Sequence, residues 1–215
     1  MKDPKDEIGI DHLIPVAIGE FINGVTTPVD LYVRLSERKF ILVAKAGSTT
    51  QKEQLSSFKD RRVDYLWVRK DHFHKVARQV ITIAGIVVKS DRLNADQKTQ
   101  VVSSAAKTVF KQLDQMGISI ESYQQAKAVT EVTIALVEAL NDVSSLLGSL
   151  AEANDDLVRH SMAVSALSVM IAQAMNWENK LTLEKLALGG LLHDVGKKNA
   201  SQRAHEKTIE PHDTG

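Results

Sequence analysis

The 215-residue chain contains no cysteine, which excludes disulfide bonds and thiolate metal ligands and favours a reducing compartment. It has only four prolines, and none between Pro28 and Pro211, which is typical of a long succession of helices. Aromatic residues make up 5% of the chain. The formal charge is zero, so no overall field favours a nucleic acid polymer or an anionic membrane.

Long apolar segments are also missing. The first residues, MKDPKDEIGID, are polar and charged, without the apolar core of a signal sequence. The most apolar run, Val80 to Val88, has about nine residues, whereas a membrane span needs about 20. We therefore expect a cytoplasmic protein with no membrane span.

The first third of the chain has short patterns that are typical of strands. Pro28 to Leu35 and Lys39 to Gly47 are rich in β-forming residues and flank a polar turn, which predicts a hairpin. Val63 to Lys70 predicts a third strand. We expect a small α+β domain here.

From Asp71 onward the apolar residues recur at helical spacing. Helices are predicted from Asp71 to Val88, from Thr99 to Met116 with Gly117 closing the helix, and from Ile120 to about Leu150. The predicted fold is an α+β N-terminal domain followed by an all-α region. We divide the chain into residues 1–90, a regulatory or sensor domain, 91–150, a helical stalk or linker, and 151–215, a partial helical bundle with a polar tail.

Two further helices are predicted near the end. One begins at Asn154 or Asp155, and its expected core-facing stripe consists of His160, Val164, Leu167, Ile171 and Met175. The next is expected to be capped by Thr182 and to turn Leu183, Leu186, Ala187 and Gly190 inward. Gly189 and Gly190 permit close approach of a neighbouring helix, and Gly196 is expected to end this helix in a left-handed conformation.

The second of these helices ends on His193 and Asp194, close to its inward face. A buried ionised carboxylate is costly unless it is paired or binds a metal. Together with His160, the pair offers two imidazoles and a carboxylate, a good donor set for a divalent transition metal. Lys197 places a cation where it could meet a phosphate oxygen. The structural alternative stays open, because a histidine near a helix end is also a favourable partner of the helix dipole.

The segments NDDLVRHSMAVSALSVMIAQAMNW and LTLEKLALGGLLHDVGKK resemble the opening of an HD-type metal-dependent phosphohydrolase domain, and more narrowly of the HD-GYP subgroup. The resemblance implies a helical bundle that binds two or more iron or manganese ions and hydrolyses cyclic di-GMP. It implies that His160, His193 and Asp194 ligate metal, and that Asp194 and Lys197 act in catalysis. The segments VDLYVRLSERKFILVAKAG and VDYLWVRKDHF resemble the α+β regulatory domain often placed before HD-GYP domains.

The sequence departs from the subgroup in two ways. Where the family has a glutamate ligand, this chain has Ala151, and Glu152 becomes a candidate ligand only if one residue is deleted. No Gly-Tyr-Pro motif follows, and the polar tail offers only His205, His212 and Asp213 as metal-capable groups. The chain is therefore expected to hold only the front part of the domain.

Two functions follow from this interpretation. The first is a cyclic dinucleotide phosphodiesterase that is incomplete as given and inactive as this chain alone. The second is a catalytically inactive signalling or interaction module in which the HD remnant is structural. Because helices that expect further partners leave an apolar face uncovered, we also expect a homodimer through Ile120–Leu150, or a partner protein.

Overall fold

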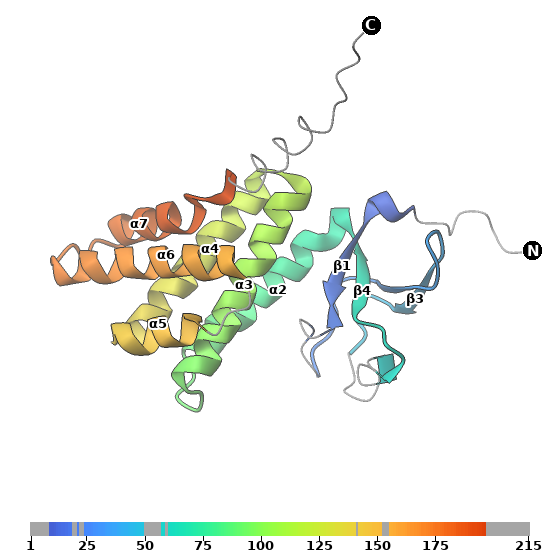
Figure 1. The fold of residues 1–215 in the computed structure, drawn as a ribbon, viewed down its shortest axis with the longest axis horizontal. Coiled ribbons are helices and arrows are strands. Elements are labelled where there is room, and N and C mark those ends of the chain that lie inside the picture. Colours follow the sequence, from blue (N-terminus) through green and yellow to red (C-terminus); the bar gives the residue numbers. More distant parts are fainter. Residues whose placement is uncertain are drawn as a thin grey trace, which may run out of the picture. The chain divides into compact units, whose positions relative to one another are not determined.

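The computed structural model describes residues 9–18, 21, 24–49, 57–58, 60–140, 142–151 and 155–196. The chain divides into two compact units, Met1–Gln79 and Val80–Gly215. The strands lie in the first unit and most of the helices in the second (Figure 1). The predicted fold class, α+β followed by all-α, is thus confirmed. The boundary between the units falls within a helix at Gln79, whereas the sequence analysis placed it near residue 90.

The first unit contains one antiparallel sheet in the order β1-β4-β2-β3. Its elements are η2 (Ile10–His12), β1 (Leu13–Ala17), β2 (Leu31–Arg34), β3 (Phe40–Ala44), β4 (Tyr65–Arg69), η4 (Lys70–His72) and the start of α2 (Phe73–Val88). The predicted hairpin is β2–β3 and the predicted third strand is β4. Strand β1 was not predicted. It is an edge strand that contains Pro15, and its partner β4 follows about 50 residues later.

Alternation along the strands gives the sheet two different faces. Ile14, Val16, Leu66 and Val68 point to one face and are at most 2% exposed. On the same face Leu31 and Val33 continue the apolar layer. These side chains form the core of the first unit, and the opposite face carries the larger aromatic residues of the same strands.

The second unit is a bundle of helices around one apolar core. It contains the end of α2, α3 (Ala95–Met116), α4 (Ile120–Leu140), α5 (Val143–Ala151), α6 (Asp156–Ala174) and α7 (Lys180–Leu192). Residues of all six helices share this core, so the segment 91–150, expected as a stalk or linker, packs with α6 and α7. Asn94 starts α3 with a reciprocal capping box to Gln97. Gly117, at φ 75°, ends it as predicted.

The segment Ile120–Leu150 is two helices rather than the single one expected. Helix α5 begins after Asp142, whose side chain accepts hydrogen bonds from the backbone N–H groups of Ser144 and Ser145. Hydrogen bonds from Ser145, and then from Ser144, hold the pKa of Asp142 below its ordinary value. The short polar side chain caps α5, and the chain turns there.

The predicted core stripe of α6 is wrong. Ile171 and Met175 are 59% and 51% exposed, and His160 is also exposed. The buried face consists instead of Val158, Ser161, Met162, Ser165, Ala166, Val169 and Ala172. Where α7 approaches most closely, the inward residue of α6 is the small Ser165, whereas Ile171 and Met175 lie on another face.

Two details of α7 also differ from expectation. Its N-cap is Asn179, which accepts from the N–H of Leu181, rather than Thr182. Its regular part ends at Leu192, and Gly196 does not have a positive φ. The inward face predicted for α7 is largely correct, since Leu183, Ala187 and Gly190 are buried.

One described helix is long and apolar enough to cross a membrane by length and composition, namely α6. Of the apolar stretch of this helix, 39% is buried inside the helical unit. A core helix of a folded domain can have the same length and apolar composition. Helix α6 supplies Met162 and Val169 to the core.

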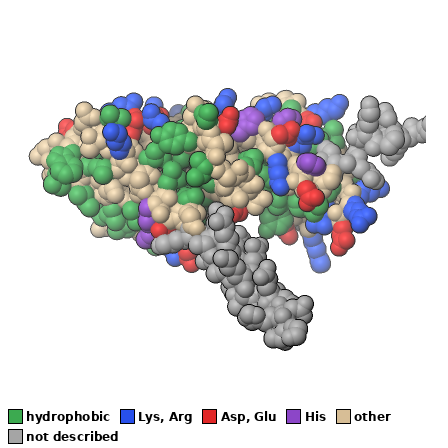
Figure 2. Space-filling model, turned by 90° about the horizontal axis from the view of Figure 1, so that it is seen from above, with side chains coloured by type: hydrophobic (Ala, Val, Ile, Leu, Met, Phe, Trp, Pro, Cys, Tyr) green, Lys and Arg blue, Asp and Glu red, His purple; other side chains and the backbone are tan. Residues whose placement is uncertain are grey.

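Several large apolar side chains around the α6–α7 connection are exposed: Ile171, Met175, Trp177 and Leu181, each at more than half of its surface. Figure 2 shows apolar side chains as continuous green areas on the surface of the helical unit. By contrast, Val129 and Leu136 of α4 are fully buried in the chain's own core. Self-association through Ile120–Leu150 stays a prediction, and Ile120, Tyr123 and Leu147 of this segment are among the exposed apolar residues.

We expect Asp155→Ala to destabilise the helical unit by about 1 kcal/mol, because the Asp155 carboxylate accepts from the N–H groups of Leu157 and Val158 at the start of α6. Urea denaturation followed by circular dichroism measures this. The matched control is Asp156→Ala in the same turn, which removes only an exposed pair with Arg159 and is expected to change stability by less than about 0.5 kcal/mol. Equal effects of the two changes would show that the cap contributes nothing.

Candidate metal centre

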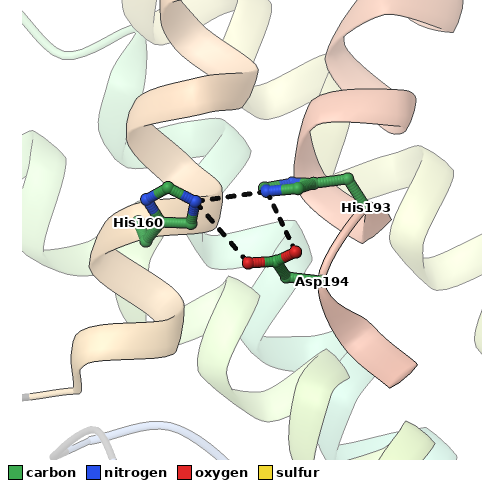
Figure 3. Close-up of side chains that lie close together, drawn as sticks. All are labelled: His160, His193 and Asp194. Atoms are coloured by element: carbon green, nitrogen blue, oxygen red, sulfur yellow. Dashed lines mark hydrogen bonds and ion pairs between the residues drawn. The ribbon is translucent and has the colours of Figure 1, made fainter. Parts of the chain in front are cut away.

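Three side chains meet where the first turns of α6 lie beside the end of α7 (Figure 3). His160 comes from α6, and His193 and Asp194 directly follow the last residue of α7. The two Nε2 atoms are 3.2 Å apart. Asp194 places Oδ2 at 3.6 Å from Nε2 of His160 and Oδ1 at 3.3 Å from Nε2 of His193.

The three groups differ in their exposure to solvent. The Asp194 side chain is 10% exposed, that of His193 35% and that of His160 55%. The carboxylate thus lies on the inner side and the imidazoles on the outer side. An ion or substrate would approach past the two rings.

A backbone hydrogen bond orients the His193 ring. Its Nδ1 lies 2.8 Å from the carbonyl oxygen of Gly190, which can only accept. Nδ1 therefore carries the proton, and in a neutral ring the lone pair is on Nε2, which faces His160 and Asp194. A backbone carbonyl commonly holds a metal-binding histidine in this way.

The donor set fits a single divalent transition metal. Ligand atoms at about 2.1 Å from a common ion lie about 3.0–3.4 Å from one another in octahedral or tetrahedral geometry. The two Nε2 atoms are 3.2 Å apart, and each has a different oxygen of Asp194 beside it, at 3.3 Å for His193 and 3.6 Å for His160. With one ligand atom taken from each residue, the three atoms lie within 4.8 Å of one another. Imidazole and carboxylate suit iron, manganese or zinc, and three protein ligands leave positions free for water and substrate.

The spacing of the two helices at this site depends on Gly190. A Cβ added to Gly190 would lie 2.7 Å from the Cα of Ser165, closer than real Cβ contacts allow. The Ser165 hydroxyl donates to the carbonyl of Ala187 at 2.8 Å, which joins the same helices one turn earlier. Gly190 therefore both sets the distance between α6 and α7 and supplies the carbonyl that orients His193.

The structure brings together three of the predicted site residues: His160, His193 and Asp194. Lys197, Glu152 and the tail residues His205, His212 and Asp213 lie outside the described residues. Within the described part of the chain, His12, His72 and His74 belong to no group that could hold a metal. Sequence analysis missed Ser165, although small residues at Ser161 and Ser165 are a signal for close helix packing.

Residues 157–213 match the family model of the HD domain. The chain therefore carries an HD domain segment, as the motif around His193 and Asp194 predicted. A solved structure described as Bd1817, a HDG"Y"P protein from Bdellovibrio bacteriovorus, is similar to this chain in fold, with a TM-score of 0.51 and 18% sequence identity. A search of curated proteins gave no match.

The fold similarity covers 87% of this chain and 61% of that structure. The matched 87% of this chain contains more residues than the second unit, 80–215. The matched region therefore includes part of the first unit as well. The chain spans about three fifths of the length of the similar structure.

We expect Gly190→Ala to weaken binding of Mn²⁺ by tenfold or more, because the added methyl group forces α6 and α7 apart and separates His160 from His193. Isothermal titration calorimetry measures the affinity. Gly189→Ala is a matched control: Gly189 is exposed on the same helix, and its Cβ would meet nothing within 4 Å. It should leave affinity unchanged while stabilising the helix by up to about 1 kcal/mol. Unchanged metal affinity in Gly190→Ala would show that this contact does not position the site.

Metal should also stabilise the helical unit. At a free Mn²⁺ concentration 100 times the dissociation constant, the expected gain is about 2.7 kcal/mol, and addition of a chelator should reverse it. His193→Ala should abolish this gain, whereas His12→Ala, at an exposed histidine outside the group, should keep it. Thermal unfolding with and without metal measures both, and a gain retained in His193→Ala would place the ion elsewhere.

Proposed function

We propose that the HD segment is the front part of a metal-dependent phosphodiesterase of the HD-GYP subgroup that hydrolyses cyclic di-GMP. The observation that carries this proposal is the convergence of His160, His193 and Asp194 on one possible ion position. The motif LLHDVGK and the description of the similar structure as a HDG"Y"P protein support the narrower assignment to the subgroup.

In this proposal each residue has a distinct task. His160 and His193 bind the ion through Nε2, and the hydrogen bond from Nδ1 to Gly190 holds His193 in the productive tautomer. Asp194 would hold the metal through its carboxylate and would be the ligand shared with a second ion. A bound divalent ion supplies an activated water and neutralises charge on the phosphodiester. We assign Lys197 to a phosphate oxygen, where its cation would balance charge that develops in the transition state.

Three ligands are few for a site with two metals. Glu152 is proposed as a further ligand. Other donors would come from a more complete domain, since this chain covers 61% of the similar structure. The imidazole and carboxylate donors favour iron or manganese for this site. The first unit is proposed to regulate the domain in the cytoplasm.

A catalytically inactive signalling module is the second candidate. It is favoured by one observation: within the described part of the chain, only three donors gather at the site. A module of this kind would keep the fold without the activity. Its exposed apolar side chains near Trp177 would form a contact surface for a partner or a second copy.

The test is hydrolysis of cyclic di-GMP by the purified chain with Mn²⁺, followed by chromatography of the products. If the chain is an enzyme, His193→Ala and Asp194→Asn should each lower turnover by about 100-fold or more, and His12→Ala should leave it unchanged. Metal binding without turnover would fit both the incomplete enzyme and the inactive module, and the same assay on the full reading frame that contains this chain would then separate them. Turnover that persists in both site variants would contradict the proposed site.

A further inference from the structure

The face of the sheet opposite its core is unusually aromatic for this chain. The sequence has only ten aromatic residues, and Tyr32, Phe40, Tyr65 and Trp67 lie on this face. Strand pairing aligns Trp67 with Tyr32 on β2, which in turn lies opposite Leu42 on β3. Tyr65 and Leu42 are 52% and 43% exposed.

One cation is fixed within this aromatic face. The guanidinium carbon of Arg34 lies 5.7 Å from the ring centre of Trp67, and Phe40 packs edge-on against the same ring at 5.2 Å. The Nε–H group of Arg34 donates to the carbonyl of Ser36 at 3.1 Å. Stacking and this hydrogen bond hold the guanidinium in place, so less conformational freedom is lost when it binds an anion.

The neighbouring arginine on the face is already neutralised. Arg69 donates two hydrogen bonds to Asp71, at 3.0 and 2.8 Å, and this pairing lowers the pKa of Asp71 and raises that of Arg69. Arg34 differs, because no carboxylate of the described residues forms an ion pair with it. Among the described residues, its two terminal nitrogens have no ion-pair partner, and they can pair with an outside acceptor.

We propose that this aromatic face, defined by Arg34, Phe40, Leu42, Tyr65 and Trp67, binds an acidic segment of a partner protein. A carboxylate of the partner pairs with the two terminal nitrogens of Arg34, and an adjacent apolar side chain packs on Leu42 and Tyr65. Charge supports an acidic partner, since residues 1–79 carry 14 basic and 11 acidic side chains. A planar guanidinium beside exposed apolar surface matches that chemistry.

A single-stranded nucleic acid fits this face less well. Such binding relies on open aromatic rings for base stacking and on several unpaired cations along the backbone. Here Arg34 lies over the ring of Trp67, Phe40 contacts the same ring, and Arg69 is paired with Asp71. Among the described residues of this face, Arg34 is the one arginine without a paired carboxylate, which suits a carboxylate better than a phosphate backbone.

The test selects binders from a random 12-residue peptide library displayed on phage, with the full chain as bait. The best peptides are then titrated against a Trp177→Phe variant, in which Trp67 is the only tryptophan and its fluorescence reports binding at this face. Selected peptides should carry an acidic residue next to an apolar one. Arg34→Gln should weaken their binding about tenfold or more, and Leu42→Ser should weaken it as well.

Arg61→Gln is the matched control, because it removes the same charge at an exposed position of the same unit. It should leave affinity within about twofold, since screened surface charges contribute little. Failure to enrich acidic peptides, or equal losses in Arg34→Gln and Arg61→Gln, would overturn the proposal. Binding of a 12-nucleotide oligothymidylate that depends on Arg34 and exceeds peptide binding would assign the face to nucleic acid instead.

Discussion

The candidate metal site depends on a contact that contains no metal ligand. At Gly190 the backbones of α6 and α7 approach so closely that a methyl group would lie 2.7 Å from the Cα of Ser165. Metal coordination tolerates displacements of only about 0.5 Å, so the spacing of two helices must be fixed before their side chains can share an ion. A glycine on one helix and a serine on the other fix that spacing through van der Waals contact and one buried hydrogen bond.

The same packing makes it possible to bury Asp194. A carboxylate that is only 10% exposed is unfavourable unless opposite charge or hydrogen bonds compensate for lost water. The surrounding core, with fully buried Leu136, Met162 and Leu191, supplies the apolar contacts that keep the helices in place despite this cost. The carboxylate is thus held between two imidazoles in the geometry that a divalent ion would stabilise.

Much of this arrangement could be predicted from sequence because it is local. The motif around His193 and Asp194, the cap at Asp155 and the end at Gly117 each depend on neighbouring residues. What could not be predicted depends on distant residues. Periodicity selected Ile171 and Met175 for the core of α6, whereas the buried face lies elsewhere on the helix and includes Ser165, where α7 approaches closely. Strand β1 likewise forms only because β4 pairs with it.

The exposure gradient across the site also restricts how a substrate can be bound. In the proposed function a phosphodiester would approach from the side of the imidazoles, because among the described residues Asp194 is buried and His160 is 55% exposed. Long-range attraction contributes little to that approach, because residues 80–215 carry 13 basic and 16 acidic side chains. For the proposed anionic substrate, binding energy would therefore come from groups at the site itself. In the proposed function those groups are the bound ion and Lys197, whose cations would act at short range, where solvent screening is weakest.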